Sequence, residues 1–382
     1  MGQSFESSIE PTVVLNLLIV DNSIAFTGAF KAAFNQAVIL SDKYNVSFLI
    51  NKKSANARLL NELGIPHYSL HLRELRRSLI DIILYLPLLI INSFRLVRLL
   101  KNQKIDVIQI NDYYNLLGVL SKLMGYKGKL ITYVRLLPSS TPFGLDKLWF
   151  WFAQKFSHKV IVVSDAVLTE IPQRINVVRI YDPVQFFEKY PIRSDVFSAN
   201  EFKFLYLANY TKGKGQEYAI YAFMKALQKN PNIRLDFFGG DFGLEKNRVF
   251  RMELEQMVVI AGLNDVIKFY DFVQDIEDVI KDHSVLLNFS ISESFSMTCA
   301  EASFYGRPVI ATRCGGPEEI IENRVSGLLV PVGDISAMAD AMISLSLDRG
   351  AAMQMGVAGS RRIRQMFSVV AYKNHFLNAL NS

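Results

Sequence analysis

The sequence is poor in cysteine and has no long uninterrupted apolar run. Its 382 residues include only two cysteines, Cys299 and Cys314, too few for the disulfide framework of a secreted domain. We therefore expect a cytoplasmic protein in which both thiols are small buried residues rather than reactive groups. Residues 1–11 are polar and lack the apolar core of a signal peptide. No stretch approaches the roughly 18 apolar residues that span a membrane.

Common metal and nucleotide-loop patterns are also missing. No two aspartates are separated by a single residue, and the five histidines show no zinc-binding spacing with one another or with cysteine. There is no Gly-Lys-Ser/Thr of a Walker A loop and no nucleic-acid-binding motif. We therefore expect no metal, no cofactor and no nucleic-acid partner.

The chain does contain enough apolar material for two globular domains. Half of its residues are hydrophobic and 20% are charged, and 382 residues exceed what one hydrophobic core usually supports. The net charge is +6, from 42 basic and 36 acidic residues. This balance favours anionic partners, such as a nucleotide-sugar or a phospholipid surface.

Strand-like and helix-like patterns alternate along the whole chain, which predicts parallel sheets covered by helices on both faces. A segment without clear periodicity at 182–200 separates two strand series. We predict an α/β protein with domains at 1–182 and 183–366, followed by a terminal segment at 367–382 with a helix over 369–380. The expected strands lie at 13–20, 46–50, 106–110, 130–134 and 159–164 in the first domain, and at 202–207, 234–239, 266–270, 285–289 and 308–312 in the second.

Two glutamates, Glu293 and Glu301, mark the most informative stretch. Glu293 follows the expected buried strand at 285–289, and Glu301 lies in a helix that Gly306 and Pro308 terminate. Backbone N–H groups at the start of that helix would face a phosphate. Two acceptors for sugar hydroxyls beside an anion site suit a nucleotide-sugar. The alternative is a solvated face followed by an ordinary helix start.

A second basic motif follows the expected strand at 202–207. Lys212, Gly213, Lys214 and Gly215 precede a helix predicted over 217–229. Glycine lets the backbone approach an anion closely, and a helix N-terminus adds its dipole. A lysine at this turn would neutralise a diphosphate leaving group. Taken alone, the motif would be interpreted by default as a flexible solvated loop with surface lysines.

The block from 285 to 334 resembles the retaining glycosyltransferases of family four, which have the GT-B fold. The resemblance rests on Glu293 and Glu301, on Gly306-Arg307-Pro308 before a strand, and on Gly315-Gly316-Pro317 beyond it. It implies two Rossmann-like, doubly wound parallel-sheet domains facing a central cleft, with ligands at the carboxyl ends of the strands. It also implies a last helix that crosses back onto the first domain.

The same resemblance implies roles for residues of the second domain. Glu301 would hold the ribose hydroxyls of the donor, and Glu293 would contact the transferred sugar and stabilise charge. Lys214 would contact the diphosphate. Asn209 stands where the family has an arginine, so Lys212 would substitute for it, although the two cations are not equivalent. Further donor contacts would come from Phe295, Ser296, Met297 and Thr298, from Gly239 and Gly240, and from Phe272 and Val273.

The family transfers its sugar with retention of anomeric configuration, and the resemblance implies the same here. In its usual description, the departing phosphate oxygen deprotonates the acceptor on the same face, so no protein base is required. With no metal expected, Lys214, Lys212 and the helix N-terminus would stabilise the leaving diphosphate electrostatically.

Candidate residues in the first domain are Gly28, Asp112, Tyr113 and Arg135. Gly28 ends the loop after the first predicted strand, which resembles a family loop that often has two adjacent glycines, and the other three lie just after predicted strand ends. In the family, the position of Arg135 commonly carries a histidine that touches donor or acceptor. Arg135 could bind an anionic group, or it could be an ordinary ion-paired residue. The sequence favours neither reading.

Seven basic residues in the segment 73–104 surround an apolar stretch at 79–91, where we expect Pro87 to kink or restart a helix. A buried helix covering the first sheet accounts for most of this stretch. Alternatively, its basic flanks and part of its apolar face dock peripherally on an anionic bilayer, the inner face of the plasma membrane. The four aromatic residues at 149–152 would then add interfacial anchors.

These features favour a metal-independent glycosyltransferase. It would move a sugar from a nucleotide-diphosphate-sugar to a saccharide or lipid-linked saccharide acceptor, in cell-surface polysaccharide or glycolipid synthesis. Two alternatives remain open. One is a nucleotide-sugar epimerase of the same fold. The other is a non-catalytic relative that only binds nucleotide-sugars, suggested by Asn209 and the single Gly28.

Overall fold

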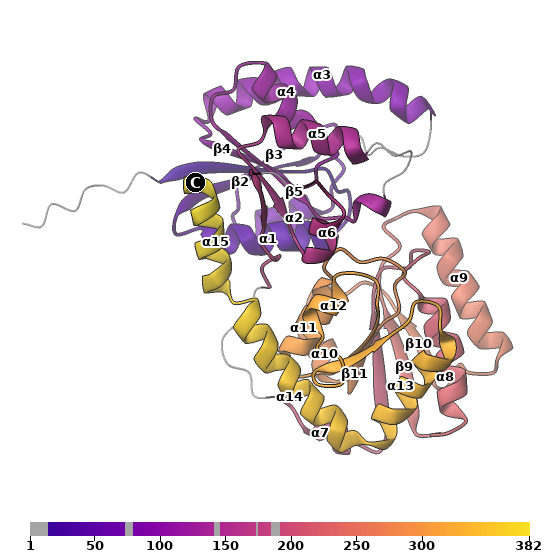
Figure 1. Ribbon diagram of the computed structural model, residues 1–382. Coiled ribbons are helices and arrows are strands. Elements are labelled where there is room, and N and C mark those ends of the chain that lie inside the picture. Colours follow the sequence, from indigo (N-terminus) through magenta and orange to yellow (C-terminus); the bar gives the residue numbers. More distant parts are fainter. Residues whose placement is uncertain (1–13, 73–78, 141–145, 173–174, 185–191) are drawn as a thin grey trace, which may run out of the picture.

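The computed structural model describes residues 14–72, 79–140, 146–172, 175–184 and 192–382. Within them the chain forms two α/β units, one above the other in Figure 1, each built on a parallel sheet. Residues 1–11, the arginines Arg73, Arg76 and Arg77, and part of the predicted linker lie outside the described residues.

The N-terminal unit is built on a sheet of seven strands in the described part of the chain, in the order β3-β2-β1-β4-β5-β6-β7. All neighbouring strands are parallel. The strands are β1 (Leu15–Asp21), β2 (Tyr44–Asn51), β3 (His67–Leu70), β4 (Val107–Ile110), β5 (Lys129–Val134), β6 (Lys159–Val162) and β7 (Val177–Arg179).

The C-terminal unit repeats this arrangement with six strands among the described residues, in the order β10-β9-β8-β11-β12-β13, again all parallel. In both sheets the strand order reverses beside the first strand of the unit, which is where doubly wound sheets open a crevice. The strands are β8 (Phe202–Leu207), β9 (Ile233–Phe238), β10 (Ile267–Tyr270), β11 (Val285–Asn288), β12 (Val309–Thr312) and β13 (Gly327–Val330).

Helices cover both faces of each sheet (Figure 1). The N-terminal unit has α1 (Gly28–Leu40), α2 (Asn56–Glu62), α3 (Leu79–Asn102), α4 (Leu117–Leu123), the 3-10 turn η1 (Pro138–Ser140), α5 (Asp146–Phe156) and α6 (Asp165–Thr169). The C-terminal unit has α7 (Asp195–Ser198), α8 (Gln216–Leu227), α9 (Glu245–Ile260), α10 (Glu277–Lys281), α11 (Met297–Phe304), α12 (Pro317–Ile320), α13 (Ile335–Leu347) and α14 (Arg349–Met366), and α15 (Val369–Asn381) ends the chain.

The apolar strands are buried on both faces because successive side chains point in opposite directions. In β1, Leu17 and Ile19 join the core that contains α1, whereas Leu18 and Val20 join the core under α3. The α/β, doubly wound parallel-sheet architecture predicted from the sequence is therefore confirmed. The domain limits at 182/183 and 366/367 stay predictions.

The edge strands β3, β7 and β13 are absent from the sequence-based prediction. Each has only three or four residues, and each includes partly exposed positions. An edge strand has a neighbour on one side only, so it needs no continuous apolar run. The pattern that identifies central strands is therefore missing there.

The prediction for Pro87 was wrong in one respect, because α3 continues without a restart from Leu79 to Asn102 with Pro87 inside it. Pro87 lies on the exposed face of the helix. A proline is tolerated inside a helix where the carbonyl oxygen that loses its N–H donor finds another partner.

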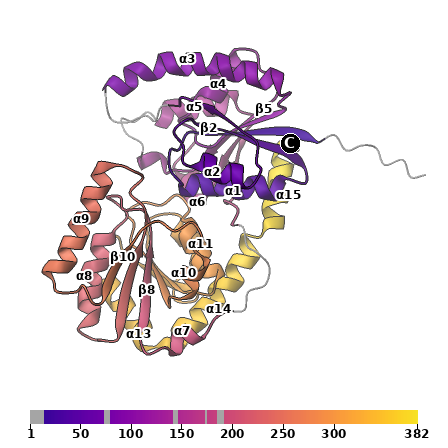
Figure 2. The ribbon, with the colours of Figure 1, turned by 180° about the vertical axis from the view of Figure 1, so that it is seen from behind.

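The last two helices connect the units. Figures 1 and 2 show α14 running along the C-terminal unit and α15 continuing onto the N-terminal one. The hydroxyl groups of Tyr372 and Tyr133 are 3.0 Å apart, and Lys373 forms an ion pair with Asp42. The final helix therefore packs on the N-terminal unit although it follows the C-terminal unit in sequence.

Candidate active site

Glu293 lies in the loop that connects β11 to α11. Its N–H donates to the Cys314 carbonyl (2.9 Å), and its carbonyl accepts from Gly316 N–H (2.8 Å). Gly316 must lack a side chain, because a Cβ there would lie 2.3 Å from the Phe295 Cα. The glycine pair recognised in the sequence therefore packs against the loop that carries the glutamate and holds its backbone.

Three donors surround the Glu293 carboxylate. Oε1 accepts hydrogen bonds from Lys214 Nζ (2.8 Å) and Ser290 Oγ (2.8 Å), and Asn288 Nδ2 lies at 3.5 Å. Burial disfavours the charged form of Lys214, but attraction and hydrogen bonding to Glu293 outweigh it and raise the pKa of Lys214 above its ordinary value. The ammonium group is therefore charged at neutral pH. Ser290 was not singled out by sequence reasoning.

Lys214 is positioned by two left-handed glycines in the turn before α8, Gly213 (φ +93°) and Gly215 (φ +76°). A Cβ on Gly215 would lie 2.0 Å from the Phe289 carbonyl oxygen, so the turn sits directly on the end of β11. The Lys214 carbonyl also accepts from the Tyr206 hydroxyl. The turn is thus a packed element of the site, not a free solvated loop.

The start of α11 lies beside this ion pair. Its N-cap, Ser296, has φ 78° and ψ 78°, and its side chain caps no N–H of the first turn. Instead its hydroxyl accepts from Asn288 Nδ2 at 2.9 Å. A non-glycine residue in this backbone region carries strain, which is typical of functional sites. The uncapped N–H groups provide the positive end of a helix dipole.

Glu301 lies further along α11 and is buried. Its Oε1 is 2.5 Å from Nζ of Lys31, which belongs to α1 of the N-terminal unit. Sequence reasoning did not identify Lys31. The Thr27-Gly28 helix start could have drawn attention to α1, but only the packing of the two units brings Lys31 to Glu301.

Two adjacent cavities between the units contain most of the predicted site. The larger cavity, of about 570 Å³, is lined by residues that include Gly28, Arg135, Asp182, Lys212, Lys214, Glu293, Phe295, Ser296 and Met297. The smaller cavity, of about 100 Å³, is lined by residues that include Phe26, Gly28, Lys31, Asn209, Phe238, Gly239, Phe272, Val273, Met297, Thr298 and Glu301. Gly28 and Met297 line both cavities.

The predicted diphosphate residues differ in what they can contribute. Asn209 Oδ1 accepts from Gly240 N–H at 2.9 Å, so this side chain fixes the turn after β9 rather than supplying charge. Lys212 lines the larger cavity, but its side chain is 74% exposed and its Nζ lies 3.5 Å from Glu253. Of these three residues, only Lys214 has a fixed ammonium group that contacts Glu293, the glutamate predicted to bind the transferred sugar.

Arg135 forms a buried ion pair with Asp182 (2.8 Å), and its guanidinium stacks on the Tyr133 ring at 4.2 Å. The structure therefore shows the ion pair, and Arg135 also lines the larger cavity. Its main chain does contact the active-site loop, because the Ser294 hydroxyl donates to the Arg135 carbonyl at 2.6 Å. The two units thus meet directly beside Glu293.

Asp112 and Tyr113 are not brought into the cleft. Both are buried, and neither lines the two cavities. Burial raises the pKa of Asp112 to about 8, and Tyr113 packs edge-on against Trp149. Asp112 Oδ1 instead accepts from Arg135 N–H at 3.4 Å.

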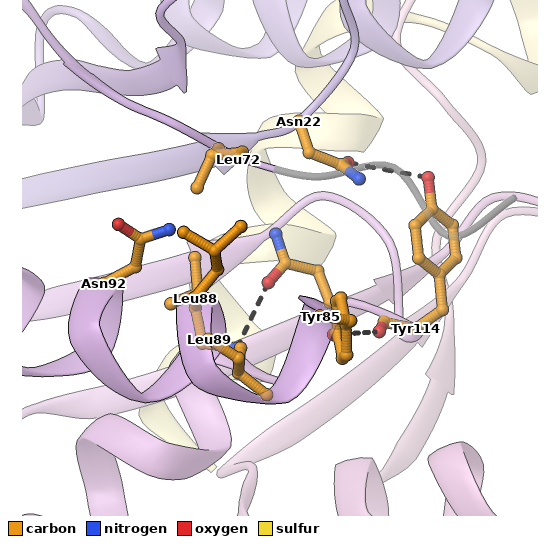
Figure 3. A pocket seen from close by; sticks show the side chains of 9 residues that line it. Asn22, Leu72, Tyr85, Leu88, Leu89, Asn92 and Tyr114 are labelled. Carbon is orange, nitrogen blue, oxygen red and sulfur yellow. Dashed lines mark hydrogen bonds between the residues drawn. The ribbon is translucent and has the colours of Figure 1, made fainter. Parts of the chain in front are cut away.

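A further small pocket lies under α3 (Figure 3). Asn22 and Tyr114 form its polar side, with Asn22 Oδ1 3.5 Å from the Tyr114 hydroxyl, and Leu88 and Leu89 form its apolar side. Its volume of about 20 Å³ accommodates little more than a water molecule. It is too small for a sugar acceptor.

Within the described ranges, no group of three or more histidine, cysteine, aspartate or glutamate side chains could hold a metal ion. Cys299 and Cys314 are buried, and burial raises the pKa of both thiols. The prediction that both are buried residues is confirmed. No helix in the described part of the chain is both long and apolar enough to cross a membrane.

Residues 201–348 match the model of the family described as glycosyl transferases group 1. This stretch contains Lys214, Glu293 and Glu301. The match covers less than half of the chain, and over this stretch the family resemblance found in the motif block is confirmed.

Curated relatives match part of the chain. The D-inositol 3-phosphate glycosyltransferase of Saccharomonospora viridis is 35% identical over 128 residues, 33% of this chain and 28% of that protein. The N-acetyl-alpha-D-glucosaminyl L-malate synthase of Bacillus anthracis is 26% identical over 171 residues, 44% of this chain and 42% of that protein. The chain thus spans less than half the length of these two relatives.

Solved structures match nearly the whole chain. HepE of Anabaena, in complex with UDP and glucose, superposes with a TM-score of 0.80 at 22% identity, covering 96% of this chain and 100% of that one. Sucrose-phosphate synthase of Thermosynechococcus elongatus gives a TM-score of 0.77 at 17% identity, covering 95% and 98%. The two-sheet GT-B fold is therefore confirmed.

Proposed function

We propose that this protein is a retaining, metal-independent glycosyltransferase that moves a sugar from a nucleotide-diphosphate-sugar to a saccharide or lipid-linked saccharide acceptor. The supporting observation is the Lys214–Glu293 ion pair, with 2.8 Å between Nζ and Oε1, in the larger cavity beside the uncapped start of α11. The Lys214 cation, the Glu293 carboxylate and backbone N–H groups converge there. The cation and the N–H groups can stabilise the leaving diphosphate, and the carboxylate can contact the transferred sugar.

In the proposed reaction, the bond between the anomeric carbon and the leaving phosphate oxygen breaks, and a bond from that carbon to the acceptor oxygen forms on the same face. The acceptor proton passes to the departing phosphate oxygen. Lys214 and the α11 N–H groups stabilise the negative charge that develops on the diphosphate. Glu293, held by Lys214 and Ser290, faces the sugar and its developing positive charge.

The donor's nucleoside would occupy the smaller cavity, where Glu301 accepts from the ribose hydroxyls and apolar side chains contact the base. The structures of HepE with UDP and with UDP-glucose favour UDP-sugars as the first donors to examine. We place the pathway in cell-surface polysaccharide or glycolipid synthesis.

The direct test is a screen of nucleoside diphosphate sugars by thermal shift, followed by product analysis of any donor that binds. A glycosyltransferase releases nucleoside diphosphate slowly alone and faster with a saccharide acceptor. Conversion of the donor sugar without release of nucleotide would instead identify an epimerase. Binding without turnover, unaltered in Glu293→Ala, would identify a non-catalytic relative.

As a partner of this enzyme, we propose an anionic membrane surface that contacts α3 and α5. On α3, Leu86 (59% exposed), Ile90 (49%) and Phe94 (64%) are spaced four residues apart and share one face. Further along the same helix, Arg95, Arg98 and Lys101 are exposed. Apolar and cationic side chains on one helix suit the headgroup region of an anionic bilayer.

Helix α5, which contacts α4 as α3 does, also exposes an aromatic ring beside a cation. Trp151 is 44% exposed, and Lys155 Nζ lies 4.7 Å from its ring centroid. Vesicle flotation tests the proposal: Ile90→Ser with Phe94→Ser should reduce retention on anionic vesicles. Met252→Ser with Val259→Ser on α9, where both residues are exposed, is the matched control. Equal retention of both double variants, or none for the wild type, would contradict docking through α3.

A further inference from the structure

The smaller cavity has one wall from each unit. Phe26 and Lys31 come from the N-terminal unit, whereas Phe272 and Glu301 come from the C-terminal unit. The family resemblance implies roles for residues on the C-terminal side of this cavity, and on the N-terminal side it singles out only Gly28. It assigns no role to Phe26 or Lys31.

Lys31 makes the polar contact across this cavity. Its Nζ lies 2.5 Å from Glu301 Oε1, and the two side chains are 21% and 8% exposed. Lys31 and Glu301 also line a third cavity of about 480 Å³. Their ion pair therefore lies between this third cavity and the smaller cavity. A ligand that approaches Glu301 from the smaller cavity therefore meets the Lys31 ammonium as well.

Phe26 makes the apolar contact across the same cavity. Its ring centroid is 5.7 Å from that of Phe272 at an interplanar angle of 53°, and 5.7 Å from that of Phe30 in α1. Phe272 is 44% exposed, so the aromatic pair has room to open. Aromatic rings at this spacing provide a face on which a nucleobase can stack.

A nucleoside presents the matching groups. Its ribose hydroxyls can donate to Glu301, while their oxygens, or a base carbonyl, can accept from Lys31, since an ammonium group has three donors and Glu301 uses one. Its base is planar and suits the aromatic pair. The smaller cavity also adjoins the larger one at Gly28 and Met297, so a diphosphate can continue towards Lys214.

We infer that Lys31 and Phe26 of the N-terminal unit complete the site for the nucleoside of a ribonucleoside diphosphate, with Lys31 binding it jointly with Glu301 and Phe26 covering the base. This inference rests on the proposed function. It assigns the donor to both units, whereas the roles implied by the family resemblance assign its nucleoside to the C-terminal unit alone. Donor binding then holds the two units together.

The test is calorimetric titration of the full chain with UDP, with ADP and GDP in parallel, and with inorganic diphosphate. Lys31→Met should weaken nucleotide binding about tenfold, and Phe26→Leu should weaken it several-fold. Neither should alter the affinity for inorganic diphosphate, which needs only Lys214 and α11. Lys31→Arg should retain most of the nucleotide affinity, because it keeps a cation beside Glu301.

Lys373→Met is the matched control. It also removes an ion pair that joins α15 to the N-terminal unit, with Asp42, but Lys373 lines neither cavity. Its nucleotide affinity should equal that of the wild type. A loss of both nucleotide and diphosphate binding in Lys31→Met would indicate general structural damage and overturn the specific role.

The outcomes separate the two proposals. If the wild type binds a nucleotide and Glu301→Gln weakens it, but Lys31→Met and Phe26→Leu do not, the inference fails and the proposed function stands. If the wild type binds neither nucleotides nor inorganic diphosphate, the proposed function fails, and the inference fails with it.

Discussion

Lys214 and Glu293 form a 2.8 Å ion pair between the turn before α8 and the loop after β11, two segments 79 residues apart in sequence. Each segment is held by glycines that pack on backbone, Gly215 on Phe289 and Gly316 on Phe295. The pair is therefore preorganised by the fold. Preorganised charge is what electrostatic catalysis requires, because no reorganisation is then needed during the reaction.

Removing the Lys214 cation should reduce turnover more than donor binding. We expect Lys214→Met to lower kcat by about a hundredfold or more, in line with the loss of a single preorganised donor to developing negative charge. Steady-state kinetics with the donor found by screening measures this. Glu255→Gln, which removes an exposed ion pair with Arg251, is the control and should leave kcat unchanged. A Lys214→Met enzyme with wild-type kcat would exclude Lys214 from charge stabilisation.

Gly215→Ala should lower the free energy of unfolding by more than the conformational cost of replacing a glycine in the left-handed region. Gly262 has a similar backbone (φ +67°) with open space around it, so Gly262→Ala measures the conformational cost, about 1–2 kcal/mol. Gly215→Ala adds a contact of 2.0 Å with the Phe289 carbonyl oxygen and should displace Lys214. Urea unfolding should show a larger loss for Gly215→Ala, accompanied by loss of activity. Equal losses in the two variants would contradict the close packing of the turn.

The buried carboxyl group of Asp112 should make the free energy of unfolding fall as the pH rises. Burial raises its folded pKa to about 8, against hydrogen bonding and attraction from Arg135, whereas the unfolded value is near 3.9. The folded state thus holds a proton that the unfolded state has lost, so the contribution of Asp112 is greatest below pH 4 and declines up to pH 8.

Comparison with Asp112→Asn isolates this effect. Between pH 5 and pH 8 the wild type should lose a few kcal/mol of unfolding free energy relative to Asp112→Asn. Urea unfolding at both pH values measures the difference. A constant difference across this range would show that Asp112 does not hold its proton in the folded state.

The hydrogen bond between Tyr372 and Tyr133 should stabilise the return of α15 onto the N-terminal unit. Tyr372→Phe leaves the buried Tyr133 hydroxyl without this partner and should cost about 1–3 kcal/mol. Adding Tyr133→Phe should recover part of the loss, since neither buried polar group then remains. A double-mutant cycle measured by thermal unfolding gives the coupling free energy between the two hydroxyl groups. Additive losses of stability in the two single variants would contradict a stabilising hydrogen bond.

The central strands could be predicted from the sequence because they are continuous apolar runs. The strand at 202–207 was placed with its observed limits, and β11 and β12 were within one residue at each end. The edge strands β3, β7 and β13 were missed because they are short and partly exposed, whereas the edge strand β10 was predicted at 266–270. Pro87 was misjudged because its effect on a helix depends on whether water reaches the freed carbonyl oxygen, which the sequence does not reveal.

The site residues likewise include some that the sequence identified and some that only the structure revealed. Glu293, Lys214 and Glu301 could be selected because each follows a strand or starts a helix within a recognisable block of glycines. Lys31 and Phe26 could not, since nothing local marks them. Asp112 and Tyr113 follow a strand too, but both are buried and neither lines the cleft.

From the sequence alone we could predict the two parallel sheets, the family resemblance of residues 285–334 and the side of the second sheet where we propose that an anion binds, because periodicity and glycine positions are local properties. Only the tertiary structure decided that Lys214 pairs with Glu293, that Arg135 is neutralised by Asp182, and that Lys31 crosses to Glu301. Pairing between distant side chains depends on how the two units pack, and packing is decided by the sum of many weak contacts along the whole chain.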